Sequence, residues 1–230
     1  MLFRQLFDRD SCTYTYLLAD EQQAVLIDPV LGQVDRDAQI LAELSLELLF
    51  TLETHIHADH ITGAAMLRDR LGSQTVVSEA GEAECADRAV NHGDEIRFGG
   101  RHLSILATPG HTSTCVSYLL DDKSMVFTGD ALLVRGCGRT DFQCGDSATL
   151  YQSVHSQILT LPARCRVYPG HDYQGRTMTT VAEELTHNPR LGGGRTVDQF
   201  IEIMDQLNLA QPAKIDIAVP ANQKCGAPEG

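Results

Sequence analysis

Three histidines and an aspartate fall within the six residues 55–60, as His55, His57, Asp59 and His60. They follow Leu48–Leu52, an apolar run of the length expected for a buried strand. A turn at the end of a strand can aim several side chains at one point, whereas a helical histidine pair needs a spacing of four. Such a density of imidazole and carboxylate groups is unusual for a surface turn. We therefore interpret residues 55–60, called here the histidine loop, as part of a metal site.

Three further candidate ligands share one layout, in which a predicted strand is followed by a glycine and then by the ligand. They are His111, Asp130 and His171. Glycine has no Cβ and lets the backbone turn sharply at the end of a strand. Each of these turns is weak evidence alone, but together with the histidine loop they predict a complete set of metal ligands.

Ligand chemistry alone predicts a binuclear zinc hydrolase, in which a metal-bound hydroxide is the nucleophile. In that arrangement Asp130 would bridge the two ions. One zinc would be held by His55, His57 and His111, and the other by Asp59, His60 and His171.

Short apolar runs separated by turns and amphipathic stretches predict an α/β fold with two sheets and helices outside. The clearest helix is Thr196–Leu207, where Thr196 and Gln199 fit a capping box ahead of an apolar stripe. Further helices are predicted at Val34–Leu44, Ile61–Leu71, around 150–158, and at Thr177–His187. Strands are predicted at Thr13–Leu18, Ala24–Ile27, Leu48–Leu52, Thr75–Ser78, Ile96–Phe98, Leu103–Ala107, Cys115–Leu120, Met125–Thr128 and Val167–Tyr168.

The charge balance limits the partners that such a chain can bind. With 31 acidic and 18 basic residues, the net charge of -13 repels nucleic acid and anionic lipid. No apolar stretch approaches the ~20 residues that span a bilayer, and the N-terminal region has no secretory signal pattern. We expect a cytoplasmic protein without nucleic-acid or membrane partners.

Seven cysteines are present, an odd number, and none is spaced as CxxC. This pattern predicts reduced thiols rather than a disulfide framework or a structural zinc site. Cys137, between two glycines, is expected to be a small buried residue, and Cys225 to be exposed and oxidisable.

The histidine loop and the later His, Asp and His together resemble the metallo-β-lactamase superfamily, whose ligands line one cleft. The resemblance implies an αββα sandwich of the metallo-β-lactamase type, as a single domain over residues 1–230. Within the superfamily, four segments resemble the persulfide dioxygenases, the ethylmalonic-encephalopathy-protein-like branch. These segments are Asp130–Phe142, His57–Gly63, Asn188–Leu191 and Asp216–Asn222.

This second resemblance changes the expected metal to one Fe(II) per chain, held by His55, His111 and Asp130. Two histidines and a carboxylate form a facial triad that leaves positions open for sulfur and O2. Zinc has no accessible redox change and could not serve here. The resemblance then implies that His57, Asp59, His60 and His171 do not bind the iron but orient its ligands and order water.

The same resemblance implies that the protein oxidises glutathione persulfide with O2 and water to glutathione and sulfite. It also implies that the protein is a homodimer. Arginine suits the carboxylates of glutathione, so Arg135 and Arg139 are predicted substrate contacts, together with Tyr173 and Thr112. For Arg139 an internal salt bridge with Asp141 is an equal alternative. Two other functions stay open: a binuclear zinc hydrolase of glutathione thioesters or lactones, similar to glyoxalase II, and a non-catalytic binding protein.

Overall fold

The computed structural model describes residues 1–227, which divide into two compact units. The first unit comprises residues 1–90, 96–102 and the described part of 211–230, and the second comprises 91–95 and 103–210. Each unit contains most of one six-stranded sheet. Among the described residues, no helix has the length and apolar character that crossing a bilayer requires.

The first sheet has the order β1-β2-β3-β4-β5-β6. β1, β2 and β3 pair antiparallel, and β3 to β6 pair parallel. In the parallel register Ile27 lies opposite Leu52, so β3 and β4 end at the same edge of the sheet. Asp28 and the segment before the histidine loop therefore start side by side. The strands are β1 (Leu2–Phe7), β2 (Tyr14–Asp20), β3 (Gln23–Ile27), β4 (Glu47–Leu52), β5 (Gln74–Ser78) and β6 (Arg88–Val90).

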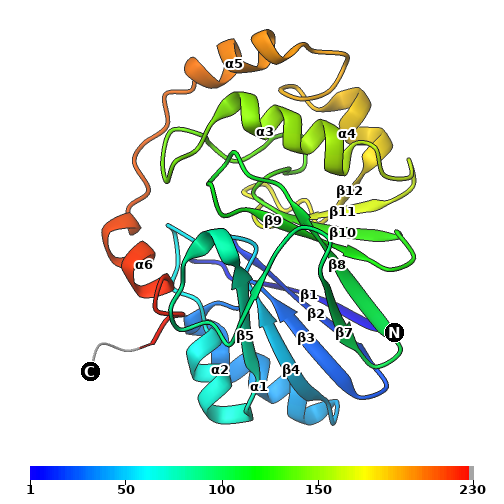
Figure 1. Cartoon of the computed structure of the whole chain (residues 1–230), viewed down its shortest axis with the longest axis vertical. Helices are drawn as coiled ribbons and strands as arrows, with labels where there is room; N and C mark the ends of the chain where they lie inside the picture. Colours follow the sequence, from blue (N-terminus) through cyan, green and yellow to red (C-terminus); the bar gives the residue numbers. More distant parts are fainter. Residues whose placement is uncertain (228–230) are drawn as a thin grey trace. The chain divides into compact units, whose positions relative to one another are not determined.

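Two helices, α1 (Val34–Glu43) and α2 (Ala64–Leu71), lie beside this sheet (Figure 1). Their apolar faces pack on the sheet through a cluster that includes Leu17, Leu26, Leu41 and Leu67, all buried. The first unit also contains three short elements: η1 (Leu31–Gln33), η2 (Glu79–Gly81) and α6 (Ile215–Asn222).

The second sheet has the order β12-β11-β10-β9-β8-β7. β10 and β11 are parallel, while β8, β9 and β10 are antiparallel, as are β11 and β12. Gly129 lies opposite Pro169, so the loops that carry Asp130 and His171 leave the sheet at one edge. The strands are β7 (Glu95–Phe98), β8 (Arg101–Ala107), β9 (Val116–Leu120), β10 (Met125–Gly129), β11 (Arg166–Pro169) and β12 (Thr179–Thr180).

Helices cover one side of this sheet as well (Figure 1). They are α3 (Ser147–Ser153), which continues into the π-helical turn η3 (Val154–Ile158), then α4 (Val181–His187) and α5 (Val197–Asp205). Leu150, Val154 and Phe200 are fully buried against strand residues such as Val126 and Val167.

The predicted strands and helices are present, with differences at their ends. α5 begins with the predicted capping box, in which Thr196 accepts from the backbone of Gln199 and the Gln199 side chain accepts from the Thr196 backbone. α2 begins at Ala64 rather than Ile61, because Thr62 forms a bridge with Val30. α4 begins later than predicted, because Thr179–Thr180 forms the edge strand β12.

Some elements were not predicted, among them β6 and α6. β6 is only three residues long, and α6 contains Pro220, which is unfavourable inside a helix.

The expectation of reduced thiols throughout is wrong for one pair, because Cys85 and Cys225 form a disulfide. Cys225 is also 1% exposed, not exposed as predicted. The two residues are 140 positions apart, so no local spacing pattern could indicate their pairing. Cys137 is buried as predicted, and burial raises the pKa of its thiol to about 11.

A buried carboxylate on α1 gives a pH-dependent prediction for stability. Asp37 is 1% exposed, its Oδ1 accepts from Arg36, and burial raises its pKa to about 6. Between pH ~4 and ~6 the folded state retains a proton that the unfolded state releases, so stability falls as pH rises through that window. Asp37→Asn should therefore stabilise the protein by about 1–3 kcal/mol at pH 8, and much less at pH 3.5.

Urea unfolding at both pH values measures this effect. Asp35→Asn is the matched control, because Asp35 lies on the same helix turn with its side chain 90% exposed. Equal destabilisation by Asp37→Asn at both pH values would contradict the argument.

Candidate metal centre

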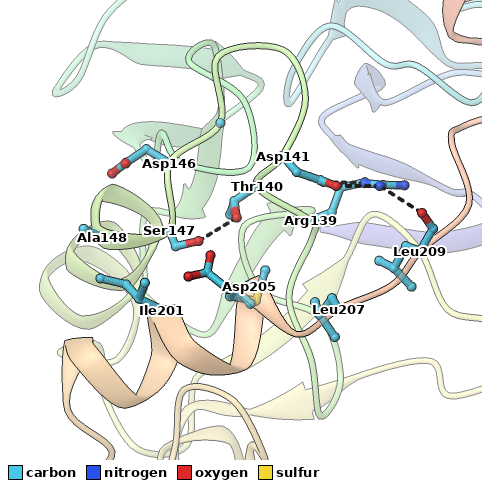
Figure 2. Close-up of a pocket in the computed structure, with 12 residues that line it drawn as sticks. Arg139, Thr140, Asp141, Asp146, Ser147, Ala148, Ile201, Asp205, Leu207 and Leu209 are labelled. Carbon is cyan, nitrogen blue, oxygen red and sulfur yellow. Dashed lines mark hydrogen bonds and ion pairs between the residues drawn. The ribbon is translucent and has the colours of Figure 1, made fainter.

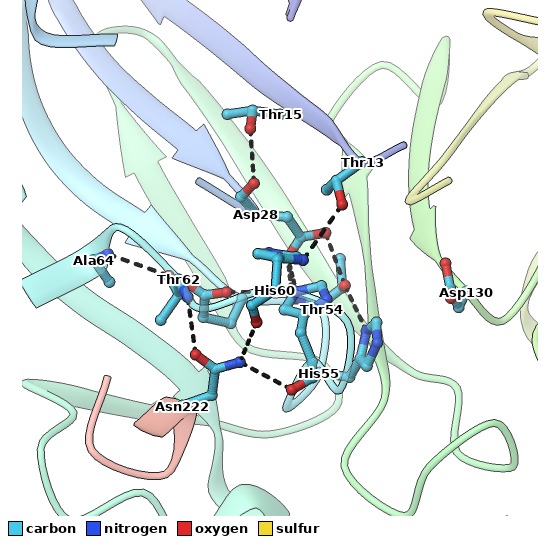
Figure 3. A network of polar contacts seen from close by, with 12 residues as sticks. Thr13, Thr15, Asp28, Thr54, His55, His60, Thr62, Ala64, Asp130 and Asn222 are labelled. Atoms are coloured by element: carbon cyan, nitrogen blue, oxygen red, sulfur yellow. Dashed lines mark hydrogen bonds and ion pairs between the residues drawn. The ribbon is translucent and has the colours of Figure 1, made fainter. Parts of the chain in front are cut away.

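In the first unit, the carboxylate of Asp28 fixes the start of the histidine loop (Figure 3). Oδ1 accepts from the backbone N–H of Thr54 at 2.7 Å, and Oδ2 accepts from the Thr54 hydroxyl at 2.8 Å. The same hydroxyl oxygen lies 3.0 Å from Nδ1 of His55. This chain of contacts orients the His55 ring and gives it Nε2 as the nitrogen to offer a metal.

His57 is fully buried and is held by two carboxylates. Its Nε2 lies 3.1 Å from Asp28 Oδ1 and 3.5 Å from Glu53 Oε2. Burial lowers the pKa of His57, but the charge and hydrogen bond of Asp28, helped by Glu53 and Asp59, outweigh it and raise the pKa to about 10. Its Nδ1 is buried with no hydrogen-bond partner among residues 1–227. These contacts fix the His57 ring, which in turn stabilises the histidine loop.

Asp59 and His60 contact each other, since Oδ2 of Asp59 lies 2.9 Å from Nδ1 of His60. The Thr13 hydroxyl lies 3.3 Å from the same nitrogen, which ties the loop to the residue before β2. Two groups in this unit bring possible metal donors within 4.8 Å of one another. These groups are His57 with Asp59 and His60, and Asp28 with Glu53 and His57.

Asn222, at the end of α6, closes the histidine loop from the other side (Figure 3). Its Nδ2 donates to the carbonyls of His57 at 2.9 Å and His60 at 2.8 Å. Its Oδ1 accepts from the N–H of Thr62 at 2.8 Å, and the Thr62 hydroxyl donates to Glu53 at 2.5 Å. Sequence reasoning gave neither Asn222 nor Thr62 a position in the site. The one available signal for Asn222 was its place in the family-like segment 216–222.

In the second unit, His111 and Asp130 face each other. The His111 Nδ1 lies 2.6 Å from the carbonyl of Arg139, which requires a protonated Nδ1 and leaves Nε2 as the nitrogen that could bind a metal. That Nε2 lies 3.8 Å from Asp130 Oδ2. Asp130 Oδ1 is 2.7 Å from Nδ1 of His171. The two oxygens of Asp130 are thus divided between His171 and the side that His111 Nε2 faces.

Glycines position these side chains, as predicted, but for two different reasons. Gly110 and Gly129 have φ of +133° and +49°, values that favour glycine. Gly170 lacks a positive φ and is needed for space, because a Cβ there would lie 2.8 Å from Asp130 Oδ1. Gly138, not predicted, is equally constrained: a Cβ would lie 2.6 Å from His111 Nδ1.

The two predicted substrate arginines make contacts inside the second unit. Arg135 pairs with the buried carboxylate of Glu184. Arg139 forms a two-point salt bridge with Asp141 at 2.6 and 2.7 Å and donates to the Ala210 carbonyl at 2.6 Å. The hydrogen bond from Arg139 holds the pKa of Asp141 below its ordinary value. The alternative considered for Arg139, an internal salt bridge, is therefore present, and a substrate contact stays a prediction for both residues.

A pocket of about 410 Å³ adjoins this ion pair (Figure 2). Asp141, Asp146 and Asp205 line it, and Arg139, already paired, is the one basic residue among its lining. Such an acidic surface does not suit the two carboxylates of glutathione.

The other two predicted substrate contacts differ in exposure. Tyr173 is 72% exposed, with its ring parallel to that of His171 at a centroid distance of 6.2 Å. It is therefore not a packed aromatic. Thr112 is buried, and its hydroxyl lies 2.9 Å from the Thr114 hydroxyl within the local turn. Both substrate contacts remain predictions.

The donors in each unit fit a resident metal ion. A carboxylate oxygen and an imidazole nitrogen 3.8 Å apart, each oriented through its other atom, form a ready pair of ligands. The buried Nδ1 of His57 has no hydrogen-bond partner within the described part of the chain, and a bound metal ion would satisfy it. Two histidines and a carboxylate suit Zn²⁺ or Fe²⁺ better than Mg²⁺ or Ca²⁺.

Comparison with known proteins agrees with this chemistry. The family model "Metallo-beta-lactamase superfamily" matches residues 11–171. The chain therefore belongs to the metallo-β-lactamase superfamily, and its fold is the predicted one.

Within the superfamily it is similar to "Persulfide dioxygenase ETHE1, mitochondrial" of Mus musculus, with 56% identity over 98% of this chain and 89% of that protein. The crystal structure of ETHE1 from Myxococcus xanthus is 57% identical, with a TM-score of 0.96 over 99% of this chain and 100% of that chain. The chain is thus a member of the persulfide dioxygenase branch. Hydroxyacylglutathione hydrolase of Brucella ovis is 40% identical over only 63% of this chain and 54% of that protein.

Asp28 gives a direct test of the first unit. Replacement by alanine removes the acceptor of the Thr54 N–H and hydroxyl and leaves His57 without its nearest carboxylate. Because loss of a residue that only orients ligands commonly costs 10–100-fold in metal affinity, we expect Asp28→Ala to weaken metal binding by about that factor.

Titration of the metal-free protein with Fe²⁺ or Zn²⁺ gives the affinity. Asp10→Ala, at an exposed position of the same unit, is the control and should bind as the wild type does. Unchanged affinity in folded Asp28→Ala protein would show that the histidine loop does not depend on this carboxylate.

Proposed function

We propose that this persulfide dioxygenase holds one Fe(II) per chain through His55, His111 and Asp130 and oxidises glutathione persulfide. The observation that carries the proposal is the facing pair in the second unit, His111 Nε2 and Asp130 Oδ2, at 3.8 Å. The near full-length similarity to persulfide dioxygenases supports the reaction type. Bound Fe(II) would supply open coordination positions and a redox change, which together allow a persulfide sulfur and O2 to react.

Neighbouring residues of the chain fix the orientation of the proposed ligand side chains before the ion binds. Asp130 keeps Oδ1 on His171 at 2.7 Å, so Oδ2 is the oxygen presented to iron. The Arg139 carbonyl holds the tautomer of His111. Thr54, backed by Asp28, does the same for His55. Ligands fixed before the metal binds reduce the reorganisation that binding costs.

The remaining predicted residues make contacts that support the histidine loop and the proposed ligand Asp130. His57 is bound to Asp28 and Glu53, and His60 to Asp59. In the second unit His171 is bound to Asp130. Each of these contacts uses one nitrogen of a histidine ring, as the contacts that orient the proposed ligands do, so the choice of one iron over two zinc ions rests on the similarity to persulfide dioxygenases.

The proposed reaction consumes glutathione persulfide, O2 and water and releases glutathione and sulfite. Of the predicted substrate contacts, Tyr173 is the most accessible and can offer its hydroxyl to the peptide. Arg139 and Arg135 would first have to leave Asp141 and Glu184. A homodimer and a cytoplasmic location remain predictions for this chain, whereas the mouse relative is named as mitochondrial.

Metal content measured together with oxygen uptake tests the function. We expect one iron per chain and O2 consumption that depends on glutathione persulfide, with sulfite as the product. Two zinc ions per chain and hydrolysis of a glutathione thioester, with no oxygen uptake, would instead support the hydrolase reading.

His111→Ala separates the proposed ligand from general structure. Loss of a residue that only orients a ligand costs 10–100-fold, so removal of a ligand itself should lower activity at least about 100-fold and deplete the bound iron. His187→Ala, at an exposed position on α4, is the matched control and should keep both. Full iron content and turnover in His111→Ala, with an unchanged circular dichroism spectrum, would refute the ligand assignment.

A further inference from the structure

The disulfide between Cys85 and Cys225 ties the C-terminal segment to another part of the first unit. Cys85 lies between η2 and β6, and Cys225 follows α6. Neither cysteine is a proposed metal ligand or substrate contact, and the function above does not require the bond. Its position relative to Asn222 nevertheless connects it to the histidine loop.

The C-terminal segment, residues 215–227, packs directly on that loop. Asn222 bonds the carbonyls of His57 and His60 and the N–H of Thr62. Next to it, the Cys225 carbonyl accepts from the N–H of Ala65 at 3.0 Å. Gly226 approaches so closely that a Cβ there would lie 2.1 Å from the Thr62 carbonyl oxygen.

We propose that the Cys85–Cys225 disulfide is a redox modification site, at which a low-molecular-weight thiol releases the C-terminal segment and loosens the histidine loop. The segment has little intrinsic stability, since α6 has eight residues, too few for an independent helix, and contains Pro220. Its order therefore depends on the covalent link and on the contacts of Asn222.

The other end of the bond is anchored independently. Arg68 on α2 donates to the Cys85 carbonyl at 2.9 Å. Nearby, Asp87 accepts from the N–H of Thr75 at 2.8 Å. These contacts do not involve the sulfurs, so we expect the Cys85 end to keep its position when the bond opens, while the C-terminal segment loses its covalent anchor.

Exposure determines which sulfur a thiol attacks. Cys85 is partly exposed and Cys225 is 1% exposed, so the incoming thiolate reaches Sγ of Cys85. A bond forms between the two sulfurs, the Cys85–Cys225 bond breaks, and its electron pair leaves with Cys225, which takes a proton from water. A second thiol then displaces Cys85. Two glutathione molecules are oxidised to glutathione disulfide, and two protein thiols are formed.

The first experiment asks whether the bond exists and opens. Peptides from the unreduced protein, after alkylation of free thiols, should include the Cys85–Cys225 cross-link. Incubation with glutathione, followed by alkylation, should instead label both cysteines. Absence of the cross-link from unreduced protein would overturn the proposal.

The second experiment follows hydrogen exchange of residues 57–65 in metal-free protein, so that it is independent of the proposed dioxygenase activity. We expect reduction by glutathione to speed exchange by about tenfold in the wild type, because the free energy required for local opening falls. Cys85→Ser should exchange fast with or without glutathione. Asn222→Ala should exchange fast even with the bond intact, which assigns the effect to the loop contacts.

The matched control is Cys144→Ser, which removes an exposed free thiol and should respond as the wild type does. Exchange that is unchanged when the bond is reduced in the wild type would overturn the proposal. This result can be obtained even if Cys85→Ser does not fold.

Discussion

The carboxylate of Asp28 is the interaction on which the histidine loop depends. It follows the end of β3, beside the end of β4, because the two strands are parallel and Ile27 pairs with Leu52. From there it holds the Thr54 backbone, the Thr54 hydroxyl and the His57 ring. Asp28 has φ of +50°, a left-handed conformation that is uncommon in non-glycine residues and that these contacts stabilise. The polar contacts of Asp28 thus stabilise its own backbone conformation and also position Thr54 and His57.

In the second unit, a backbone carbonyl orients His111 and the His171 ring orients Asp130. The parallel pair β10 and β11 delivers Asp130 and His171 to one edge of the sheet. A Cβ at Gly138 would collide with His111 and a Cβ at Gly170 with Asp130, so neither position can carry a side chain without a shift. A neutral carbonyl, that of Arg139, fixes the His111 ring. Each proposed ligand is therefore oriented by a neighbour that is not itself a proposed ligand, as is common in metal sites.

The candidate ligands could be recognised in the sequence because they are histidines and aspartates that directly follow predicted strands. Residues that position ligands have no such signature. Asn222 is 165 residues away from His57 in the chain, and the Cys85–Cys225 pair is separated by 140. The capping box of α5 was predictable because it is local, whereas the delayed start of α2 follows from a bridge between Thr62 and Val30. For Arg139 the sequence left open a substrate contact and an internal salt bridge. The salt bridge forms with Asp141, which lies only two residues further along the chain.

The account's central claim is that a single redox-active iron is held by two imidazoles and one carboxylate. Anomalous X-ray diffraction from crystals of the metal-loaded protein, collected at the iron and zinc absorption edges, tests it most directly. The account predicts one iron peak per chain, at coordination distance from His55, His111 and Asp130. Two zinc peaks bridged by Asp130, with His57 or His60 among the ligands, would contradict it.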